Sequence, residues 1–326
     1  MLRQPLCNTP SVHAPPIEVA NLTKNVAGST PALAGVSFSV EAGTVFCLLG
    51  PNGAGKTTTI NILSTLIRPT SGSATVNGFD VVRRPARVRS SIGMVGQFHA
   101  VDPLMNGREN LVLFGRLRGL RRRQAKIRAD ELLEQFSLVD AADRRLTTYS
   151  GGMLRRIDLA CALVVPPKVL ILDEPTTGLD PRSRRDVWSL VSSLGAQGIT
   201  VLLTTQYLEE ADLLSDSIVV IDRGGVIASG TAEDLKRRFG TSHCQVTPAN
   251  PADLARVAES LAGLAGMDID SDTGSISVLA PDGVATLSEV FRRVDAISVE
   301  LADISLRKPS LDEAFLHLTE RTAAPS

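Results

Sequence analysis

The sequence has few aromatic residues and no strong excess of either charge. Phe, Trp and Tyr make up 4% of the 326 residues, and 34 Lys and Arg nearly balance 35 Asp and Glu. A protein dedicated to nucleic acid usually has a basic face and aromatic rings on which bases stack. The composition therefore argues against a nucleic-acid partner.

Cysteine and histidine are also scarce, with four of each scattered along the chain. The cysteines are Cys7, Cys47, Cys161 and Cys244, and none forms a C-x-x-C pair with another. Disulfide frameworks and zinc sites require closely patterned ligands. We therefore expect reduced thiols and no metal site built from cysteine or histidine.

Long hydrophobic runs are missing, although 43% of the residues are hydrophobic. The run LACALVV at 159–165 is far shorter than the roughly 20 residues that a membrane-spanning helix needs. Residues 1–16 hold four prolines and lack the apolar segment of a signal peptide. We expect a flexible tail over 1–16 and a soluble chain that reaches a membrane only through another protein.

Residues 17–239 have the pattern of an α/β domain. Apolar strands are expected at 44–49, 169–173, 200–205 and 217–222, with helices between the later ones. Continuous apolar strands that alternate with helices are typical of a parallel sheet covered on both faces. Strand patterns before and after the first of these, with an Asn-Gly hairpin signal, indicate an added antiparallel β part. Residues 98–165 are almost entirely helical in pattern and predict a helical insert.

Residues 240–326 predict a separate, small α+β unit. Strand and helix patterns follow one another in the order of a ferredoxin-like βαββαβ fold, with one further helix at the end. Ser310 and Glu313 have the spacing of a capping box at the start of that last helix.

The stretch GPNGAGKTT at 50–58 follows an apolar strand and precedes a helix, which is the context of a phosphate-binding P-loop. Glycines let the backbone N–H groups wrap phosphates, the lysine reaches the β- and γ-phosphates, and the threonine hydroxyl binds Mg²⁺. We assign nucleotide binding to the whole loop, namely Gly50, Pro51, Asn52, Gly53, Ala54, Gly55, Lys56, Thr57 and Thr58.

The stretch VLILDEP at 169–175 supplies two carboxylates at the end of an apolar strand. Asp173 would stand at the carboxyl edge of the sheet near the P-loop and would complete the Mg²⁺ shell with Thr57. We assign Glu174 as the general base that polarises the attacking water.

A second anion site is expected at YSGGMLRR, residues 149–156. Ser150, Gly151 and Gly152 open a helix, where free N–H groups and the positive end of the helix dipole favour a phosphate. One nucleotide has little use for two such helix starts. The second start therefore predicts a site that is shared between two chains.

These stretches, with Gln97 after a short strand and TGLDP at 177–181, resemble the ATP-binding cassette of ABC transporters in content and order. The resemblance covers residues 17–239 and implies ATP and Mg²⁺ as ligands. It implies that Gln97 contacts Mg²⁺ or the attacking water, and that Asp180 is the D-loop aspartate and belongs to the nucleotide-binding residues. It also implies that two cassettes stack head to tail, so that Ser150, Gly151 and Gly152 of one copy clamp the ATP of the other.

A finer resemblance links nearly the whole chain to daunorubicin/doxorubicin-resistance ATP-binding subunits. It is carried by VDPLMNGRENLVLFGRLRGL, TTQYLEEAD and the C-terminal ISLRKPSLDEAFLHLT. It implies an export ATPase at the cytoplasmic face of the cell membrane, paired with separate permease subunits that carry a hydrophobic drug or polyketide lipid.

Two positions depart from the general family. Val26 stands where most cassettes have an aromatic residue that stacks on adenine, so we expect weaker stacking. Gln206, in LLTTQYLEEAD, stands where the cassettes of this family normally have their switch histidine. A glutamine amide still donates a hydrogen bond to a γ-phosphate but carries no charge, so we assign Gln206 a catalytic role beside Glu174 and Gln97.

Alternatives remain open at this stage. The basic run RLRGLRRRQAKIR at 116–128 fits a solvated helical face paired with Asp130 and Glu131, or a contact with an anionic membrane or a permease. The whole chain could also be a soluble ABC-type ATPase of translation or repair, or a nucleotide-binding regulator without turnover. Such soluble ATPases resemble tandem cassettes or cassettes split by long coiled coils, whereas this chain has one P-loop and no heptad run. Loss of Glu174 would favour a regulator, but Glu174 is present.

Overall fold

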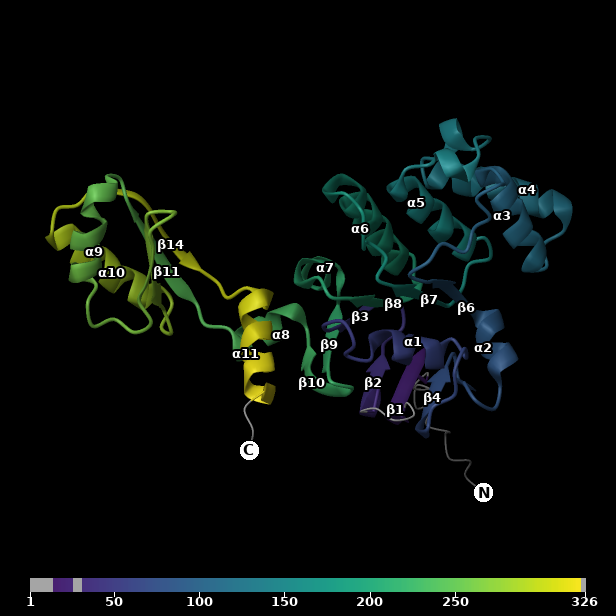
Figure 1. Cartoon of the computed structure of the whole chain (residues 1–326), viewed down its shortest axis with the longest axis horizontal. Coiled ribbons are helices and arrows are strands. Elements are labelled where there is room, and N and C mark those ends of the chain that lie inside the picture. The colour runs from purple at the N-terminus through teal and green to yellow at the C-terminus, as the bar shows by residue number, and fades with distance from the viewer. Residues whose placement is uncertain (1–13, 26–30, 324–326) are drawn as a thin grey trace, which may run out of the picture. The chain divides into compact units, whose positions relative to one another are not determined.

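The computed structural model of the chain describes residues 14–25 and 31–323. Contacts between residues divide it into two compact units, the first ending at Ser229 and the second beginning at Gly230. Each unit has its own sheets and hydrophobic core (Figure 1). This division falls earlier than the expected boundary at 239/240, because helix α8 (Ala232–Phe239) contacts helix α11 (Leu311–Ala323) of the second unit.

The first unit is built around a six-stranded sheet in the order β10-β9-β3-β8-β7-β6. Its strands are β3 (Val45–Leu49), β6 (Ile92–Val95), β7 (Val169–Asp173), β8 (Thr200–Thr205), β9 (Ser217–Asp222) and β10 (Gly225–Gly230). The pairs β9·β3, β3·β8, β8·β7 and β7·β6 are all parallel. The expected parallel sheet is thus confirmed.

Both faces of this sheet are covered. In β7, Leu170 and Leu172 pack into one hydrophobic core, whereas Val169 and Ile171 pack into another, and all four side chains are fully buried. Successive side chains of a strand point to opposite faces, so β7 is shared between two cores. This is the two-sided burial that the continuous apolar strands predicted.

Four helices connect the strands of this unit. They are α1 (Lys56–Leu63), α2 (Pro85–Ser91), α6 (Pro181–Ala196) and α7 (Leu208–Leu214). Helices α1 and α2 contribute to the core of Val169 and Ile171, and helices α6 and α7 contribute to the other core. Helix α1 ends at Leu63, and Thr65 two residues later adopts a left-handed φ of 68°, a conformation typical of helix C-termini.

An antiparallel sheet covers α1, in the order β2-β1-β4-β5. Its strands are β1 (Ile17–Lys24), β2 (Leu33–Val40), β4 (Ser71–Val76) and β5 (Phe79–Asp80). Asn77 and Gly78 join β4 to β5 with φ values of 51° and 75°. Positive φ at both turn residues is what a two-residue type I′ hairpin requires, so the hairpin signal is confirmed.

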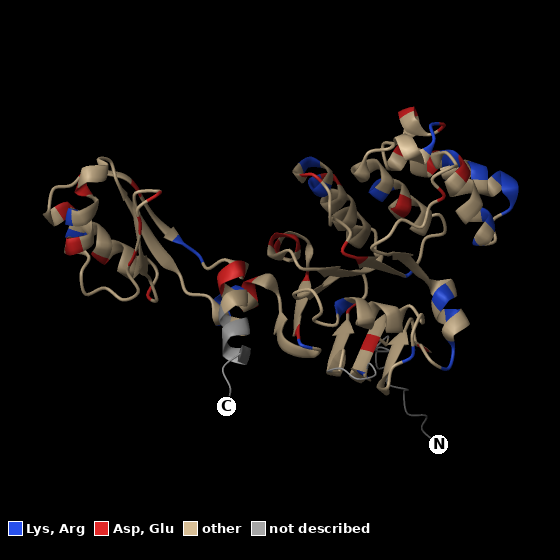
Figure 2. Cartoon of the chain, in the orientation of Figure 1, with Lys and Arg blue, Asp and Glu red and all other residues tan. Residues whose placement is uncertain are grey.

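The expected helical insert is also present, and short 3₁₀ turns at 139–141 and 146–148 connect its helices. These are α3 (Gly107–Leu117), α4 (Arg122–Gln135) and α5 (Gly151–Ala162). Their buried faces join the core that also holds Leu170 and Leu172. Figure 2 shows Lys and Arg gathered on α3 and α4, at the edge of the insert.

The second unit contains a four-stranded antiparallel sheet in the order β12-β13-β11-β14. Its strands are β11 (His243–Pro248), β12 (Asp268–Asp270), β13 (Ser275–Leu279) and β14 (Leu301–Arg307), and its helices besides α8 and α11 are α9 (Leu254–Ser260), α10 (Val284–Ala296) and a 3₁₀ turn at 251–253. This order and the βαββαβ succession are those of a ferredoxin-like fold, as predicted. Ser310 and Glu313 also form the expected capping box.

Three of the four cysteines lie in the described residues. Cys47, Cys161 and Cys244 are free and buried, as expected, and burial raises the pKa of the Cys244 thiol to about 11. Cys7 lies outside the described residues. Over the described part of the chain, every helix is too short or too polar to cross a bilayer.

Candidate active site

The loop between β3 and α1 has the shape of a phosphate cradle. Gly55 has a φ of 108°, and a Cβ there would lie 2.7 Å from the carbonyl oxygen of Ala32, so the position admits only glycine. Gly53 also has a positive φ, but a Cβ there would meet nothing within 4 Å. The first N–H groups of α1 lack acceptors within the helix. The loop therefore offers N–H donors around an open side that could hold phosphates.

Lys56 lies at the centre of the cradle with its side chain only 4% exposed. Its Nζ donates to the carbonyl oxygens of Gly50 at 2.6 Å and Pro51 at 3.1 Å. It also lies 3.4 Å from a carboxylate oxygen of Glu174. The buried ammonium is thus held by groups that a bound phosphate could replace.

The two carboxylates at the end of β7 face the start of α1. Asp173 accepts a hydrogen bond from the hydroxyl of Thr204 at 2.6 Å and lies 3.5 Å from the hydroxyl of Thr57. The backbone N–H of Glu174 donates to Thr204 at 3.1 Å, and Glu174 has a left-handed φ of 46°. Such a backbone conformation is costly for a residue other than glycine and is often found at functional sites.

The residues around Thr57 fit a magnesium ion that is also bound by phosphates. Mg²⁺ prefers oxygen ligands and is usually held by one or two protein groups together with phosphates and waters. Thr57 and Asp173 supply two such oxygens. Among the described residues there is no cluster of three or more His, Cys, Asp or Glu side chains that could hold a metal alone. The site could therefore hold Mg²⁺ together with a nucleotide.

Two glutamines stand at the same edge of the sheet. Gln206 directly follows β8, which lies between β3 and β7, and its side chain is half-buried. Gln97 is exposed and follows β6, the neighbour of β7 on the other side. The carboxyl ends of parallel strands meet at one edge of a sheet, so both glutamines belong to the edge that carries the carboxylates.

Ser150 and Asp180 cap two helices that touch each other at their starts. The hydroxyl of Ser150 caps α5 by accepting from the N–H of Met153 at 3.3 Å. Asp180 caps α6, and the hydroxyl and N–H of Ser183 lower the pKa of its carboxyl. A Cβ on Gly152 would lie 2.7 Å from the Cβ of Ser183, so the close approach of the two helices requires glycine.

Gly151 opens the exposed end of α5 beside Ser150. In the described residues no hydrogen bond or ion pair joins Ser150 to the loop at 50–58, whereas Lys56 pairs directly with Glu174. Within one chain, the structure thus brings together the P-loop and the two carboxylates. It shows no such contact between the loop at 50–58 and Ser150 among the described residues.

Two further residues of α5, which the sequence did not single out, bind the loop that carries Gln97. Arg155 is 3% exposed and donates to the carbonyl oxygens of Gly96 at 2.9 Å and Glu174 at 3.2 Å. Asp158 is 4% exposed, accepts from the N–H of Ala100 at 3.1 Å, and forms a short contact with His99. The only signal in the sequence was a charged residue on the buried face of an otherwise apolar helix.

Glu210 of α7 was also missed, and it is completely buried. Its Oε1 accepts hydrogen bonds from the hydroxyl of Thr176 at 2.9 Å and from the indole N–H of Trp188 at 3.0 Å. Its Oε2 has no hydrogen-bond partner among the described residues. Burial raises the pKa of this carboxyl. Glu210 therefore links the segment after Glu174, helix α6 and helix α7.

Val26, the position expected to face adenine, lies outside the described residues.

Comparison with known proteins agrees with this geometry. The family model for "ABC transporter" matches residues 33–177. A relative from Mycobacterium tuberculosis, "Doxorubicin resistance ATP-binding protein DrrA", is 56% identical over 298 residues, which are 90% of this chain and 89% of that protein. A relative from Streptomyces peucetius, "Daunorubicin/doxorubicin resistance ATP-binding protein DrrA", is 47% identical over 94% of this chain and 93% of its own length.

A solved structure of similar fold supports the same assignment. It is a dimeric ATP-binding cassette in a post-hydrolysis state bound to ADP and Pi. It matches with a TM-score of 0.60 and 25% identity, over 66% of this chain and 98% of that chain. With relatives of 47–56% identity along nine-tenths of its length and a complete P-loop ATPase fold, the chain belongs to the ABC transporter ATP-binding subunits of the daunorubicin/doxorubicin-resistance type.

Proposed function

We propose that the chain is the ATP-hydrolysing subunit of an exporter, located at the cytoplasmic face of the cell membrane and joined to separate permease subunits. The observation that carries the proposal is the meeting of P-loop and carboxylates, with Lys56 3.4 Å from Glu174 and Thr57 3.5 Å from Asp173. The names of the relatives support a drug of the daunorubicin/doxorubicin class as the exported molecule. A polyketide lipid is the other cargo that the family resemblance implies.

Each side chain has a distinct part in the proposed reaction. Lys56 and the N–H groups of the loop bind the phosphates of ATP, and a triphosphate in the loop competes with Glu174 for the ammonium of Lys56. The Glu174 carboxylate is then free to accept a proton from the attacking water. Thr57, Asp173 and Gln97 would hold Mg²⁺, which neutralises charge on the phosphates when bound. Gln206 orients the water or the γ-phosphate through its amide.

The second copy of the chain completes the site in this proposal. Ser150, Gly151 and Gly152 offer free N–H groups and a hydroxyl at the exposed start of α5. Asp180 caps the neighbouring helix. A head-to-tail pair would set this end of α5 against the ATP held by the loop of the partner. The similar cassette that is described as dimeric supports this arrangement.

Replacing the proposed base tests the reaction. Glu174→Gln should leave ATP binding intact and slow hydrolysis by about 10²–10⁴-fold, since an amide cannot accept the proton. ATP trapped in this variant should hold two chains together, which size-exclusion chromatography with Mg·ATP would detect. Glu134→Gln, an exposed residue of α4, is the matched control and should hydrolyse ATP like the parent. Normal turnover in Glu174→Gln would remove Glu174 from this role.

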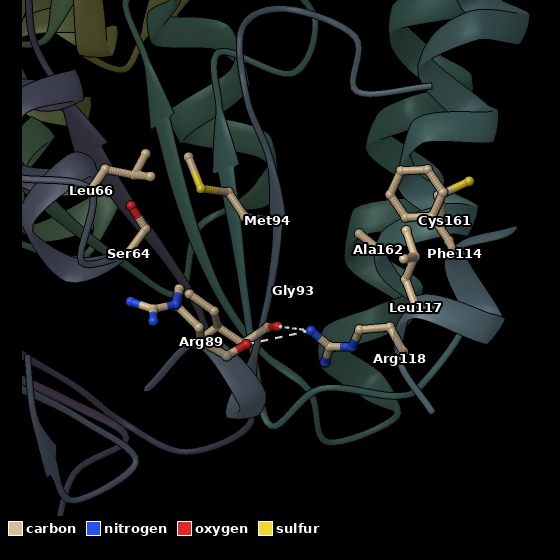
Figure 3. Close-up of a pocket in the computed structure, with 11 residues that line it drawn as sticks. Ser64, Leu66, Arg89, Gly93, Met94, Phe114, Leu117, Arg118, Cys161 and Ala162 are labelled. Atoms are coloured by element: carbon tan, nitrogen blue, oxygen red, sulfur yellow. Dashed lines mark hydrogen bonds between the residues drawn. The ribbon is translucent and has the colours of Figure 1, made fainter. Parts of the chain in front are cut away.

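A groove beside the loop of Gln97 is the proposed seat of the permease. It has a volume of about 370 Å³ and lies between the end of α1, strand β6 and helices α3 and α5 (Figure 3). Leu66 and Leu117 on its two sides are 64% and 73% exposed, and Phe114 and Met94 line it between them. Arg118 crosses its floor and donates to the carbonyl oxygens of Arg89 and Ile92. Exposed apolar residues around a groove are typical of a protein contact.

A further inference from the structure

The end of the α3–α4 pair carries more positive charge than its own acidic residues neutralise. We define the basic hairpin as the end of α3, the turn at 118–121 and the first turns of α4. It contains Arg116, Arg118, Arg121, Arg122, Arg123 and Lys126. Figure 2 shows this concentration of basic residues on α3 and α4. Neither the ATP site nor the proposed dimer contact uses it.

The two acidic residues of α4 nearest the hairpin already have other partners. Asp130 pairs with Arg108 of α3, and Glu131 pairs with Arg128 at 2.8 Å. Arg108 also pairs with Asp143 at 2.9 Å. Within the described ranges, Arg121, Arg122, Arg123 and Lys126 form no ion pair with any carboxylate. All four are exposed, so their charges face solvent.

Apolar side chains lie among these charges. Ile127 is 51% exposed and stands one helical turn after Arg123, on the side of α4 opposite the buried Ala125 and Ala129. Leu117 is 73% exposed at the other end of the turn. Exposed apolar residues among unpaired Arg and Lys are the pattern of segments that lie in the interface of an anionic bilayer.

We infer that the basic hairpin binds the anionic lipid headgroups of the membrane leaflet directly. Arg121, Arg122, Arg123 and Lys126 contact headgroup phosphates, and Ile127 inserts among the acyl chain ends. Leu117 and Arg118 also line the groove of Figure 3, so a permease segment in that groove would bring the hairpin to the bilayer. This last step rests on the proposed function, whereas lipid binding by the chain alone does not.

Vesicle sedimentation of the full chain tests the inference without a permease. The chain should sediment with vesicles of phosphatidylglycerol and phosphatidylcholine mixed, but not with pure phosphatidylcholine, and salt should weaken the binding. Each basic side chain near an anionic surface contributes about fivefold to binding. Changing Arg121, Arg122, Arg123 and Lys126 together to Gln, which keeps good helix propensity, should therefore weaken binding by at least about a hundredfold.

A matched control separates the hairpin from net charge. Changing Arg83, Arg84, Arg87 and Lys168 to Gln removes the same charge from other exposed positions and should leave vesicle binding within about threefold of the parent. Equal melting temperatures of both variants and the parent would exclude misfolding as the cause.

Equal binding of the parent to both vesicle types, or full binding by the hairpin variant, would overturn the inference. The inference would also be wrong if the hairpin variant lost co-purification with the permease while the parent chain bound no vesicles. The hairpin would then be a protein contact. Failure of the proposed function would appear instead as absent ATPase activity with vesicle binding intact.

Discussion

Gln206 stands at the carboxyl end of β8, between the strand that leads to the P-loop and the strand that carries Asp173 and Glu174. Its amide is neutral at every pH, whereas a histidine there would titrate near its usual pKa of about 6.5. In the proposed reaction this side chain would therefore orient the phosphate or the water and would add no charge.

Substitution of Gln206 separates the effect of orienting the phosphate or the water from the effect of adding charge. Gln206→Ala should lower turnover about 10²-fold, because a positioned donor to developing charge is lost. Gln206→His should stay active and gain a pH dependence of kcat between about pH 6 and 7.5 that the parent lacks. Steady-state ATPase rates across that range, with the permease present, measure both. An alanine variant as fast as the parent would leave orientation of the water to Gln97, Glu174 and Asp180.

Glu210 gives a second prediction for a single residue, this time about stability. Because burial raises its pKa, the folded chain keeps a proton that the unfolded chain has already lost. The stability of the folded state should therefore fall as pH rises from the usual glutamate pKa of about 4.3 to the raised value. Glu210→Gln keeps an acceptor for Trp188 and Thr176 and should remove this pH dependence.

Denaturant unfolding at several pH values measures the effect. Glu210→Ala leaves the buried groups of Trp188 and Thr176 without an acceptor and should cost about 2–4 kcal/mol at every pH. Glu209→Gln, on the exposed face of the same helix, should behave like the parent. An unchanged pH slope in Glu210→Gln would show that the pKa of Glu210 does not rise on folding.

At the scale of elements, α5 combines two tasks. Its first residues carry the proposed second anion site, while Arg155 and Asp158 along its buried side hold the loop of Gln97. The sequence predicted the first task from a linear pattern of Ser and Gly. It did not predict the second, because the partners of Arg155 lie in loops some 20 to 60 residues away and only packing brings them together.

A mixing experiment tests whether the start of α5 serves the partner chain. Ser150→Arg alone should bind ATP but not hydrolyse it, and Lys56→Ala alone should be inactive. A heterodimer of the two has one intact composite site and one site with both defects. ATPase activity should therefore partly return on mixing, whereas a chain that completes its own site would show no recovery.

For the whole molecule, residue pattern sufficed to predict the sheet, the helical insert and the ferredoxin-like second unit. Strands β7, β8 and β9 have the predicted bounds because each is centred on an uninterrupted apolar run, namely VLIL, VLL and IVVI. The division between the units did not follow from pattern, because α8 reads as a continuation of the α/β succession. Its contact with α11, some 70 residues later in the chain, assigns it to the second unit.

The proposed assembly with a permease gives a prediction at this scale. Leu66→Glu together with Phe114→Glu should abolish co-purification with the permease, because two charges cannot be buried in an apolar contact. ATP binding by the chain alone should be unaffected. Val139→Glu, at an exposed apolar position on the 3₁₀ turn after α4, is the matched control and should co-purify. Retention of the permease by the groove variant would place its seat elsewhere.

The shared burial of β7 has a consequence for errors in folding. A slip of one residue along this strand would exchange the contents of the two cores and, in the same movement, turn Asp173 away from Thr57. Correct folding and the proposed magnesium site thus depend on the same register. A chain that pairs this strand wrongly should therefore lose stability and ATPase activity together, rather than fold into a stable but inactive form.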